Sequence, residues 1–198
     1  MSIRPEDDHY PTPEEVTRAL LSVERFPGDV WEPCSGYGGM AAIIREAGYT
    51  VTATTLLGSR HDRNAPKHRV IGDRDFLNEK KLLKPNIVTN PPFNISTEII
   101  NHAIELGADK IAMLLDLKFL SGGARWGYPG NGPSLIKGPS RFYPIVNRVS
   151  FYPADYEGKR NSTTQNYAWF IWDTSCKGPM IEGAKLYTKD FQNLEAAQ

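Results

Sequence analysis

The sequence predicts an α/β protein built around a doubly wound, mostly parallel β-sheet. Three observations indicate this fold class and a single globular domain. Short segments rich in β-branched and apolar residues alternate with segments of helical periodicity, which is typical of a parallel sheet with connecting helices. The chain has 198 residues, the size of one domain. Its hydrophobic content of 40% is that of an ordinary globular protein. We therefore expect residues 1–198 to form a single domain.

The first half of the chain contains the opening helix and the first strands. Thr12-Pro13-Glu14-Glu15 has the spacing of a capping box, with proline at the first helical position. Apolar residues then recur at helical spacing, so a helix is expected over residues 13–25. The elements expected next are a strand at 28–33, a helix at 39–48 and strands at 49–54 and 68–72.

The second half continues this alternation and then changes character. A strand is expected at 85–90, a helix at 96–107 and a nearly apolar strand at 109–116. After Leu120 the chain is rich in glycine and proline and has no clear period, which is typical of a long functional loop. Alternation returns at 145–152 and 167–173, where two further strands are expected.

Charge and composition exclude several classes of protein. The formal net charge of +0 argues against a strongly basic surface over the whole protein, although it is compatible with a local basic patch. Neither Cys34 and Cys176 nor the four histidines show metal-ligand spacing, so no metal is expected. The first residues lack the apolar core of a signal peptide, and the most apolar run, 111–120, is too short to span a bilayer. We expect a cytoplasmic protein that makes no membrane contact.

The stretch WEPCSGYGGM, residues 31–40, lies between the first expected strand and the next helix. Its glycines allow a sharp turn and let a ligand lie against backbone amides at the helix N-terminus. Gly36, Gly38 and Ala41 also match the loose dinucleotide pattern G-x-G-x-x-A. Glu32 would repel a pyrophosphate, however, and the acid that binds an NAD ribose about 20 residues further on is missing. A carboxylate here suits an ammonium group better.

The stretch IVTNPPFN, residues 87–94, ends the fourth expected strand. Proline lacks an amide hydrogen and fixes φ, and it favours extended geometry in the residue before it. We therefore expect a strand that ends abruptly in a stiff turn. The carboxamide of Asn90 and the ring of Phe93 stand on either side of the two prolines.

The ordered pair EPCSGYGG and NPPF resembles the cofactor and catalytic loops of S-adenosylmethionine-dependent methyltransferases that modify adenine in DNA. The segments HYPTP at 9–13, RDFLN at 74–78, LKFLSGGAR at 117–125 and NYAWFIWD at 166–173 resemble further parts of that family, including its small phage and prophage members. Their order and spacing agree over residues 9–173. The resemblance implies a Rossmann-like class I methyltransferase fold, S-adenosylmethionine as cofactor and DNA as partner.

The resemblance also implies the catalytic residues, which are Asn90, Pro91, Pro92 and Phe93. Asn90 and the carbonyl of Pro91 would accept the two hydrogens of the target amine, which aims the nitrogen lone pair at the sulfonium methyl group. Phe93 would stack on the flipped base. The prolines would keep the two acceptors in place.

A cofactor site follows from the same resemblance. Glu32 would take the methionine ammonium, and Asp75 would accept from the adenine amine with Phe76 beside the ring. The cofactor-binding residues implied in this way are Tyr10, Thr12, Glu32, Pro33, Cys34, Gly36, Gly38, Thr54, Thr55, Asp75, Phe76 and Asn90. Thr12 is equally explained as a helix cap. Family members usually carry an acid after the second strand, and this chain has only threonines there, which leaves the ribose to Thr54, Thr55 or a residue such as Asp62 or Asp73.

Residues 121–165 are the expected substrate-recognition region. Basic and aromatic side chains are interleaved in and around it, which suits phosphates and unstacked bases. The expected substrate-binding residues are Phe93, Lys118, Arg125, Trp126, Arg141 and Arg148. Equally, such charges can be solvated, and such aromatic rings can anchor the loop to the core. The region is shorter than a full target-recognition domain, so specificity is expected to be relaxed or to involve a partner in an oligomer.

Two alternatives to DNA methylation stay open. The target amine could belong to a protein glutamine, to RNA or to a small molecule, although glutamine-modifying relatives usually have Tyr in place of Phe93. The chain could instead be a catalytically silent binding module with this fold, an interpretation that the missing ribose acid supports.

Overall fold

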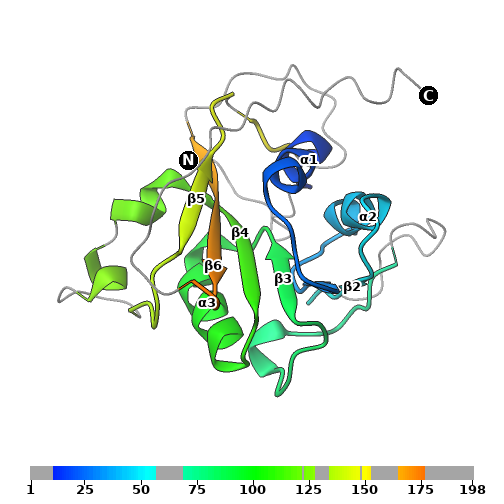
Figure 1. Ribbon diagram of the computed structural model, residues 1–198, viewed down its shortest axis with the longest axis horizontal. Helices are drawn as coiled ribbons and strands as arrows, with labels where there is room; N and C mark the ends of the chain where they lie inside the picture. Colours follow the sequence, from blue (N-terminus) through cyan, green and yellow to red (C-terminus); the bar gives the residue numbers. More distant parts are fainter. Residues whose placement is uncertain are drawn as a thin grey trace, which may run out of the picture.

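The residues that the structure describes form one six-stranded β-sheet with the strand order β2-β1-β3-β4-β6-β5 (Figure 1). In this computed structural model the described residues are 11–56, 69–121, 123–127, 134–147, 149–152 and 165–176. The strands are β1 (Val30–Glu32), β2 (Val51–Ala53), β3 (Asn86–Thr89), β4 (Lys110–Asp116), β5 (Arg141–Pro144) and β6 (Tyr167–Asp173).

Five of these six strands run in the same direction. β1 pairs in parallel with β2 and β3, and β3 pairs in parallel with β4. β6 is antiparallel to both of its neighbours, β4 and β5, so β5 shares the direction of the first four strands. We call the end of the sheet where β1–β4 finish the carboxyl end, and the opposite end the amino end. This mixed α/β sheet is compatible with a Rossmann-like fold.

Helices cover both faces of the sheet. On one face, α1 (Glu14–Val23) and α2 (Gly39–Glu46) pack side by side over β1, β3, β4 and β6 (Figure 1). On the other face, α3 (Ser96–Glu105) packs together with the 3₁₀ turns η2 (Phe76–Asn78) and η4 (Leu117–Ser121). Two more 3₁₀ turns, η3 (Phe93–Ile95) and η5 (Gly123–Trp126), follow β3 and η4. Successive residues of β4 and β6 join the two apolar clusters in turn, so both strands are buried on both faces.

Most of the expected elements are confirmed. They are the helices at 13–25, 39–48 and 96–107 and the strands at 28–33, 49–54, 85–90, 109–116 and 167–173, each with somewhat narrower bounds. In its described part, the strand expected at 68–72 is reduced to a single parallel bridge between Ile71 and Thr54. Within the described ranges, no helix is long and apolar enough to cross a membrane.

The strand expected at 145–152 is wrong. In the described part of that range only Ile145 still bonds to β6, through its N–H and the Tyr167 carbonyl, and the strand itself is β5, over 141–144. β5 is held by tertiary contacts rather than by local alternation. Phe142 stacks on Phe170 of β6, with ring centroids 5.8 Å apart. The short sequence Arg-Phe-Tyr-Pro has too few alternations to reveal this.

Thr12 does not cap α1. The helix begins at Glu14 with Pro13 as its N-cap, and no side chain bonds to its first N–H groups. The N–H of Val16 donates instead to the Pro13 carbonyl. The capping-box expectation is therefore wrong, because the Thr12 hydroxyl is engaged in a long-range contact with Asn90.

A buried carboxylate ties the end of α1 to the amino end of the sheet. Glu24 is 3% exposed and accepts hydrogen bonds from Lys110 at the start of β4 (2.7 Å), Arg141 at the start of β5 (2.7 Å) and Tyr143 (2.8 Å). Both cations also pair with Asp173 at the end of β6. Burial alone would raise the pKa of Glu24, but these donors outweigh it and hold the pKa below its ordinary value. Glu24 is therefore charged at neutral pH inside the protein.

We expect Glu24→Gln to lower the free energy of unfolding by about 3–5 kcal/mol at neutral pH, because it leaves Lys110 and Arg141 without their most buried partner. Urea denaturation measures this change. The matched control is Glu14→Gln, which breaks an exposed ion pair with Arg18 at the other end of α1 and should cost less than about 0.5 kcal/mol. Equal effects of the two substitutions would contradict the structural role given to Glu24.

Candidate functional site

The carboxyl end of the sheet between β1 and β3 is the strongest candidate for a functional site. The chain passes from β1 through α2 to β2 on one side of β1, whereas β3 lies on the other side. In open α/β sheets such a reversal leaves a crevice beyond the strand ends, where ligands bind. Glu32 finishes β1, and Asn90 directly follows β3. The topology therefore places the two predicted loops at the same end of two neighbouring parallel strands.

The turn that follows β1 requires its glycines. Gly36 and Gly38 have φ values of 52° and 83°, both in the left-handed region, and Gly38 immediately precedes α2. The N–H of Ser35 donates to the carbonyl of Thr54 beyond β2, and the N–H of Gly38 donates to the carbonyl of Ser35, both at 2.9 Å. The predicted sharp turn is confirmed, and it is fastened to the neighbouring chain segment.

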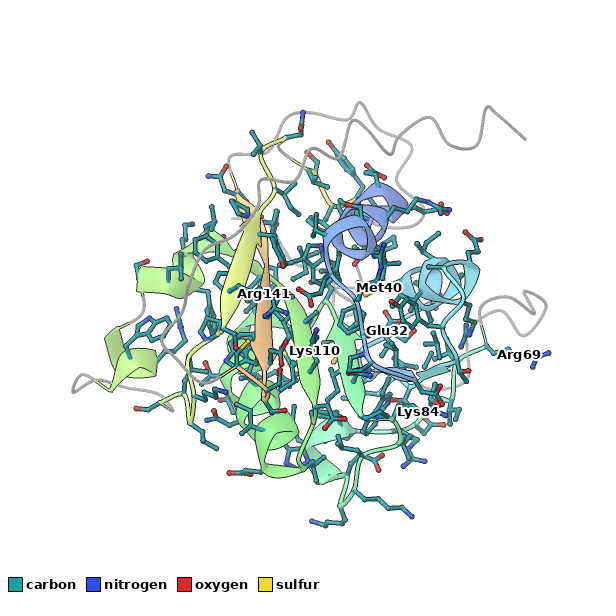
Figure 2. The ribbon with its side chains drawn as sticks, viewed as in Figure 1. Glu32, Met40, Arg69, Lys84, Lys110 and Arg141 are labelled. Carbon is teal, nitrogen blue, oxygen red and sulfur yellow. The ribbon has the colours of Figure 1, made fainter. Side chains whose placement is uncertain are left out.

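Glu32 places a buried carboxyl group in this turn. It is 2% exposed and accepts a hydrogen bond of 2.8 Å from the Ser35 hydroxyl. Burial raises the pKa of Glu32 to about 8, although the Ser35 hydroxyl, the Ala41 N–H and the charge of Arg45 act in the opposite direction. No ion pair to Glu32 is present among the described residues. Figure 2 shows Glu32 inside the molecule, in contrast to the exposed Arg69. A bound cation would supply the positive partner that the Glu32 carboxylate lacks.

The turn after β3 presents two hydrogen-bond acceptors. Asn90 donates through Nδ2 to the hydroxyl oxygen of Thr12, 3.0 Å away. Within the described part of the chain, no group donates to Asn90 Oδ1 or to the carbonyl of Pro91. The next two carbonyls are engaged, that of Pro92 by the Ile95 N–H and that of Phe93 by the Ser96 hydroxyl. Hydrogen bonds thus hold the turn around two acceptors that are themselves unoccupied among the described residues.

Phe93 projects from this turn toward solvent. Its side chain is 44% exposed. The ring of Tyr167 lies beside it, with the two ring centroids 6.0 Å apart at an interplanar angle of 42°. An exposed aromatic ring supported from one side is a surface on which a planar ligand can stack.

Asp75 and Phe76 are engaged by the fold itself. The Asp75 carboxylate accepts from the Leu77 N–H (3.0 Å) and the Asn78 side-chain amide (2.9 Å), and so caps η2. Phe76 is 4% exposed and packs edge to face against Trp31 (5.0 Å) and His102 (5.2 Å). The structure therefore places Phe76 in the core, packed between Trp31 and His102.

The threonines that follow β2 face inward. Thr54 is fully buried, and its hydroxyl accepts from the Trp31 indole N–H (2.9 Å) and lies 3.4 Å from the Pro33 carbonyl. Thr55 is 3% exposed. Burial also raises the pKa of the neighbouring Cys34 thiol to about 12, so this thiol is not a nucleophile at neutral pH. Pro33 and Cys34 follow β1, and Thr54 and Thr55 follow β2, so all four lie at the carboxyl end of the sheet.

An open depression of about 550 Å³ lies beside the end of β2. Its lining residues are Leu56, Asp73, Arg74, Asp75, Asn78 and Glu79. The N–H of Arg74 donates to the Thr55 carbonyl (2.9 Å), and the Arg74 side chain pairs with Glu79 (2.6 Å). Asp73 has a φ of 55°, and among the described residues no hydrogen bond to its carboxylate is present. Asp73 is therefore the acid of this lining whose carboxylate can still accept hydrogen bonds from a ligand.

Among the expected substrate-binding residues, some are exposed at the carboxyl end and others are engaged in contacts within the protein. Lys118 follows β4 at the carboxyl end, and its side chain is exposed. Arg125 lies over the ring of Phe119 (4.7 Å) and donates to the Phe119 carbonyl, while the Trp126 indole donates to the Leu120 carbonyl. Arg125 and Trp126 therefore anchor η5 to η4, the alternative that the sequence left open.

Arg141 requires a correction. It starts β5 at the amino end of the sheet, where it bonds to Glu24 and Asp173. The structure thus places it at the end opposite the crevice, because its guanidinium is needed to compensate buried carboxylates. Tyr10, Asp62 and Arg148 lie outside the described residues.

Tyr167 is a neighbour of the site that sequence reasoning missed. It begins β6, and because β6 is antiparallel to β4, its first residue lies opposite Asp116 at the carboxyl end. Burial and the charge of Asp116 raise the pKa of Tyr167 to about 12, so the phenol stays neutral. The direction of β6 was the missing information, since nothing in YAWFIWD shows which end of the strand meets the crevice.

Comparisons of the chain with models of protein families and with curated proteins found no match.

Glu32 should make stability fall as pH rises. Its carboxyl has an ordinary pKa of 4.5 when exposed and a pKa of about 8 when folded. Between these values the folded state holds an extra proton, so stability decreases with pH by up to about 1.4 kcal/mol per pH unit. We expect Glu32→Gln to gain stability relative to the unaltered protein between about pH 5 and pH 8, as measured by urea unfolding. A difference that stays constant over this range would contradict a buried, protonated Glu32.

Proposed function

We propose that this protein is an S-adenosylmethionine-dependent methyltransferase that acts on the exocyclic amine of adenine in DNA. One observation carries the proposal. At the end of β3 lie two hydrogen-bond acceptors, Asn90 Oδ1 and the Pro91 carbonyl, to which no group among the described residues donates. The neighbouring strand β1 ends at the buried Glu32. An amine carries two hydrogens for such a pair of acceptors, and a sulfonium cofactor carries an ammonium for the carboxylate.

The fold is proposed in the same terms. We interpret the sheet as a doubly wound, class I methyltransferase sheet, which is supported by the helices on both faces and by the reversal of strand order at β1. Residues 121–165 would form a Gly/Pro-rich basic region for substrate recognition, interrupted by the strand β5. Its described residues Arg125 and Trp126 anchor the loop beside the carboxyl end.

The residues of the crevice fit the cofactor. Glu32 would bind the methionine ammonium, whose charge would lower the carboxyl pKa from about 8. Gly36 and Gly38 would let the cofactor approach the backbone. Its adenosine part would extend toward the depression beside β2, where Asp73 would hold the ribose hydroxyls that the inward-facing Thr54 and Thr55 do not reach.

The cofactor supplies an electrophilic methyl group bonded to a positively charged sulfur. Asn90 Oδ1 and the Pro91 carbonyl would each accept one hydrogen of the target amine and so aim its lone pair toward that methyl group. Transfer would form a nitrogen–carbon bond as the carbon–sulfur bond of the cofactor broke, and the nitrogen, cationic after transfer, would give one proton to solvent. No strong base is required in this scheme. The prolines prevent drift of the two acceptors, since misplacement by about 1 Å can reduce the rate roughly 100-fold.

The substrate side of the proposal rests on Phe93. An adenine inside a duplex cannot reach the crevice, so the base would have to be flipped out of the stack. Phe93, 44% exposed and supported by Tyr167, would stack on it. Lys118 is free to contact a phosphate. We place this reaction in the cytoplasm and propose no metal and no membrane partner; an oligomer would extend the DNA contact surface.

Methyl transfer from labelled S-adenosylmethionine to unmodified DNA, RNA, free nucleotides and glutamine peptides tests the proposal. We expect transfer to DNA, and a loss of at least about 100-fold in Asn90→Ala because one acceptor is missing. Affinity for S-adenosylhomocysteine should stay within about tenfold. The control is Asn94→Ala, an exposed asparagine of the same turn, which should keep full activity.

Each other outcome has a distinct meaning. Transfer to a peptide or to RNA alone would replace the substrate class. An absence of transfer with intact cofactor binding would refute the nucleic-acid proposal. An absence of binding to S-adenosylhomocysteine at millimolar concentration would refute the methyltransferase proposal and favour a silent binding module.

A second prediction concerns Asp73. Asp73→Asn should weaken S-adenosylhomocysteine binding by roughly 10- to 100-fold, because hydrogen bonds to a charged group contribute about 1.5–3 kcal/mol. Calorimetry measures the affinity, and Asp109→Asn, an exposed aspartate at the amino end, serves as control. A 2′,3′-dideoxy analogue should bind the variant and the unaltered protein equally. If the variant weakens both ligands alike, Asp73 does not hold the ribose.

A further inference from the structure

We propose that Thr12 is a positioning residue that holds the Asn90 carboxamide with its oxygen toward the target amine. The inference rests on the proposed function. It starts from one contact that joins residues 78 positions apart, the hydrogen bond of 3.0 Å from Asn90 Nδ2 to Thr12 Oγ1. That bond occupies the nitrogen end of the carboxamide and leaves Oδ1 directed elsewhere.

The orientation of the carboxamide decides whether Asn90 can act. Its two ends have nearly the same shape, but only the oxygen accepts a hydrogen bond, while the nitrogen carries two donor hydrogens. A carboxamide turned by 180° would meet an amine donor to donor. The partner of Nδ2 therefore has a direct effect on the reaction, although it does not touch the substrate.

The contact also strengthens as the reaction proceeds. When the amine becomes cationic, its N–H group is a better donor to Oδ1, and this polarises the carboxamide. A polarised carboxamide donates more strongly through Nδ2 to Thr12, since linked hydrogen bonds reinforce one another. Thr12 would thus stabilise the transition state more than the bound substrate, which affects kcat rather than KM.

The local sequence is suited to this task on both sides. Thr12 stands between Pro11 and Pro13, and Asn90 is followed by two prolines, so both partners lie in stiff backbone. Pro13 serves as the N-cap of α1 without any side-chain cap bond. The Thr12 hydroxyl is therefore available to Asn90.

The fold fixes the position of Thr12 through α1. The Trp169 indole of β6 donates to the Val16 carbonyl in the first half of the helix (3.0 Å). Glu24, which follows the helix, is held by Lys110 and Arg141. A helix fastened along its length carries the residue in front of it to a defined place at the carboxyl end.

Two substitutions of Thr12 test the inference. Thr12→Val has nearly the same shape but no hydroxyl, and Thr12→Ser keeps the hydroxyl. We expect Thr12→Val to lower kcat by about 10- to 100-fold with KM and S-adenosylhomocysteine affinity within about threefold. Thr12→Ser should restore kcat to within about threefold of the unaltered protein. The control is Thr17→Val, which removes a buried hydroxyl in α1 that has no partner among the described residues and should leave kcat unchanged.

The contrary results are equally defined. A kcat within twofold in Thr12→Val, or an equal loss in Thr12→Ser, would overturn the positioning role. The bond itself is measured without any activity, by NMR of the side-chain amide of Asn90 in ¹⁵N-labelled protein, assigned by its absence in Asn90→Asp. Its hydrogens should exchange faster in Thr12→Val and not in Thr12→Ser. Unchanged exchange would refute the contact, whereas faster exchange without any methyl transfer by the unaltered protein would refute the proposed function and leave the contact standing.

Discussion

The buried carboxylate of Glu24 is the interaction on which the arrangement of the other parts depends. It receives donors from β4 and β5 and lies directly after α1, so it fixes a helix, two strands and, through Asp173, the end of a third strand relative to one another. Figure 2 labels both cations of this cluster, Lys110 and Arg141. Such buried pairs add little net stability over an apolar core, but removal of one member is costly. Their main effect here is to allow one position for α1.

The sheet separates structural and chemical roles between its two ends. At the amino end, the buried charges compensate one another. At the carboxyl end, Glu32 lacks an ion-pair partner among the described residues, and Asn90 Oδ1 and the Pro91 carbonyl lack described donors. Groups with unmet electrostatic or hydrogen-bonding needs, next to a reversal of strand order, are typical of a ligand site. Because α1 is fastened at the amino end and leads back to Thr12, the first arrangement supports the second.

The sequence predicted the parts of this molecule that depend on local chemistry. Helical periodicity, strands such as KIAMLLD and YAWFIWD, and the turns at Gly36, Gly38 and the two prolines follow from short-range preferences. What depends on tertiary contacts could not be predicted in this way. β5 is held in the sheet by the stacking of Phe142 on Phe170. Arg141 lies at the amino end because it donates a hydrogen bond to Glu24 there. The spacing of the capping box was real, but it could not show that Asn90 competes for the hydroxyl of Thr12.

The candidate site shows the same division. The residue types at Glu32 and Asn90 could be chosen from the sequence because their chemistry is carried by short motifs. The inward direction of Thr54 and the burial of Phe76 depend on packing against Trp31, a contact between segments far apart in the chain. The Asp73 carboxylate stays available because Arg74 pairs with Glu79 and the Leu77 N–H donates to Asp75.

We propose that the two acceptors hold an exocyclic amine of adenine for methyl transfer. Nucleoside mass spectrometry of unmodified DNA, digested after incubation with the protein and S-adenosylmethionine, tests it most directly. We expect N6-methyladenine as the modified nucleoside. Methylation on a ring carbon, or on the amine of cytosine in place of adenine, would contradict it, as would DNA that remains without any modified nucleoside.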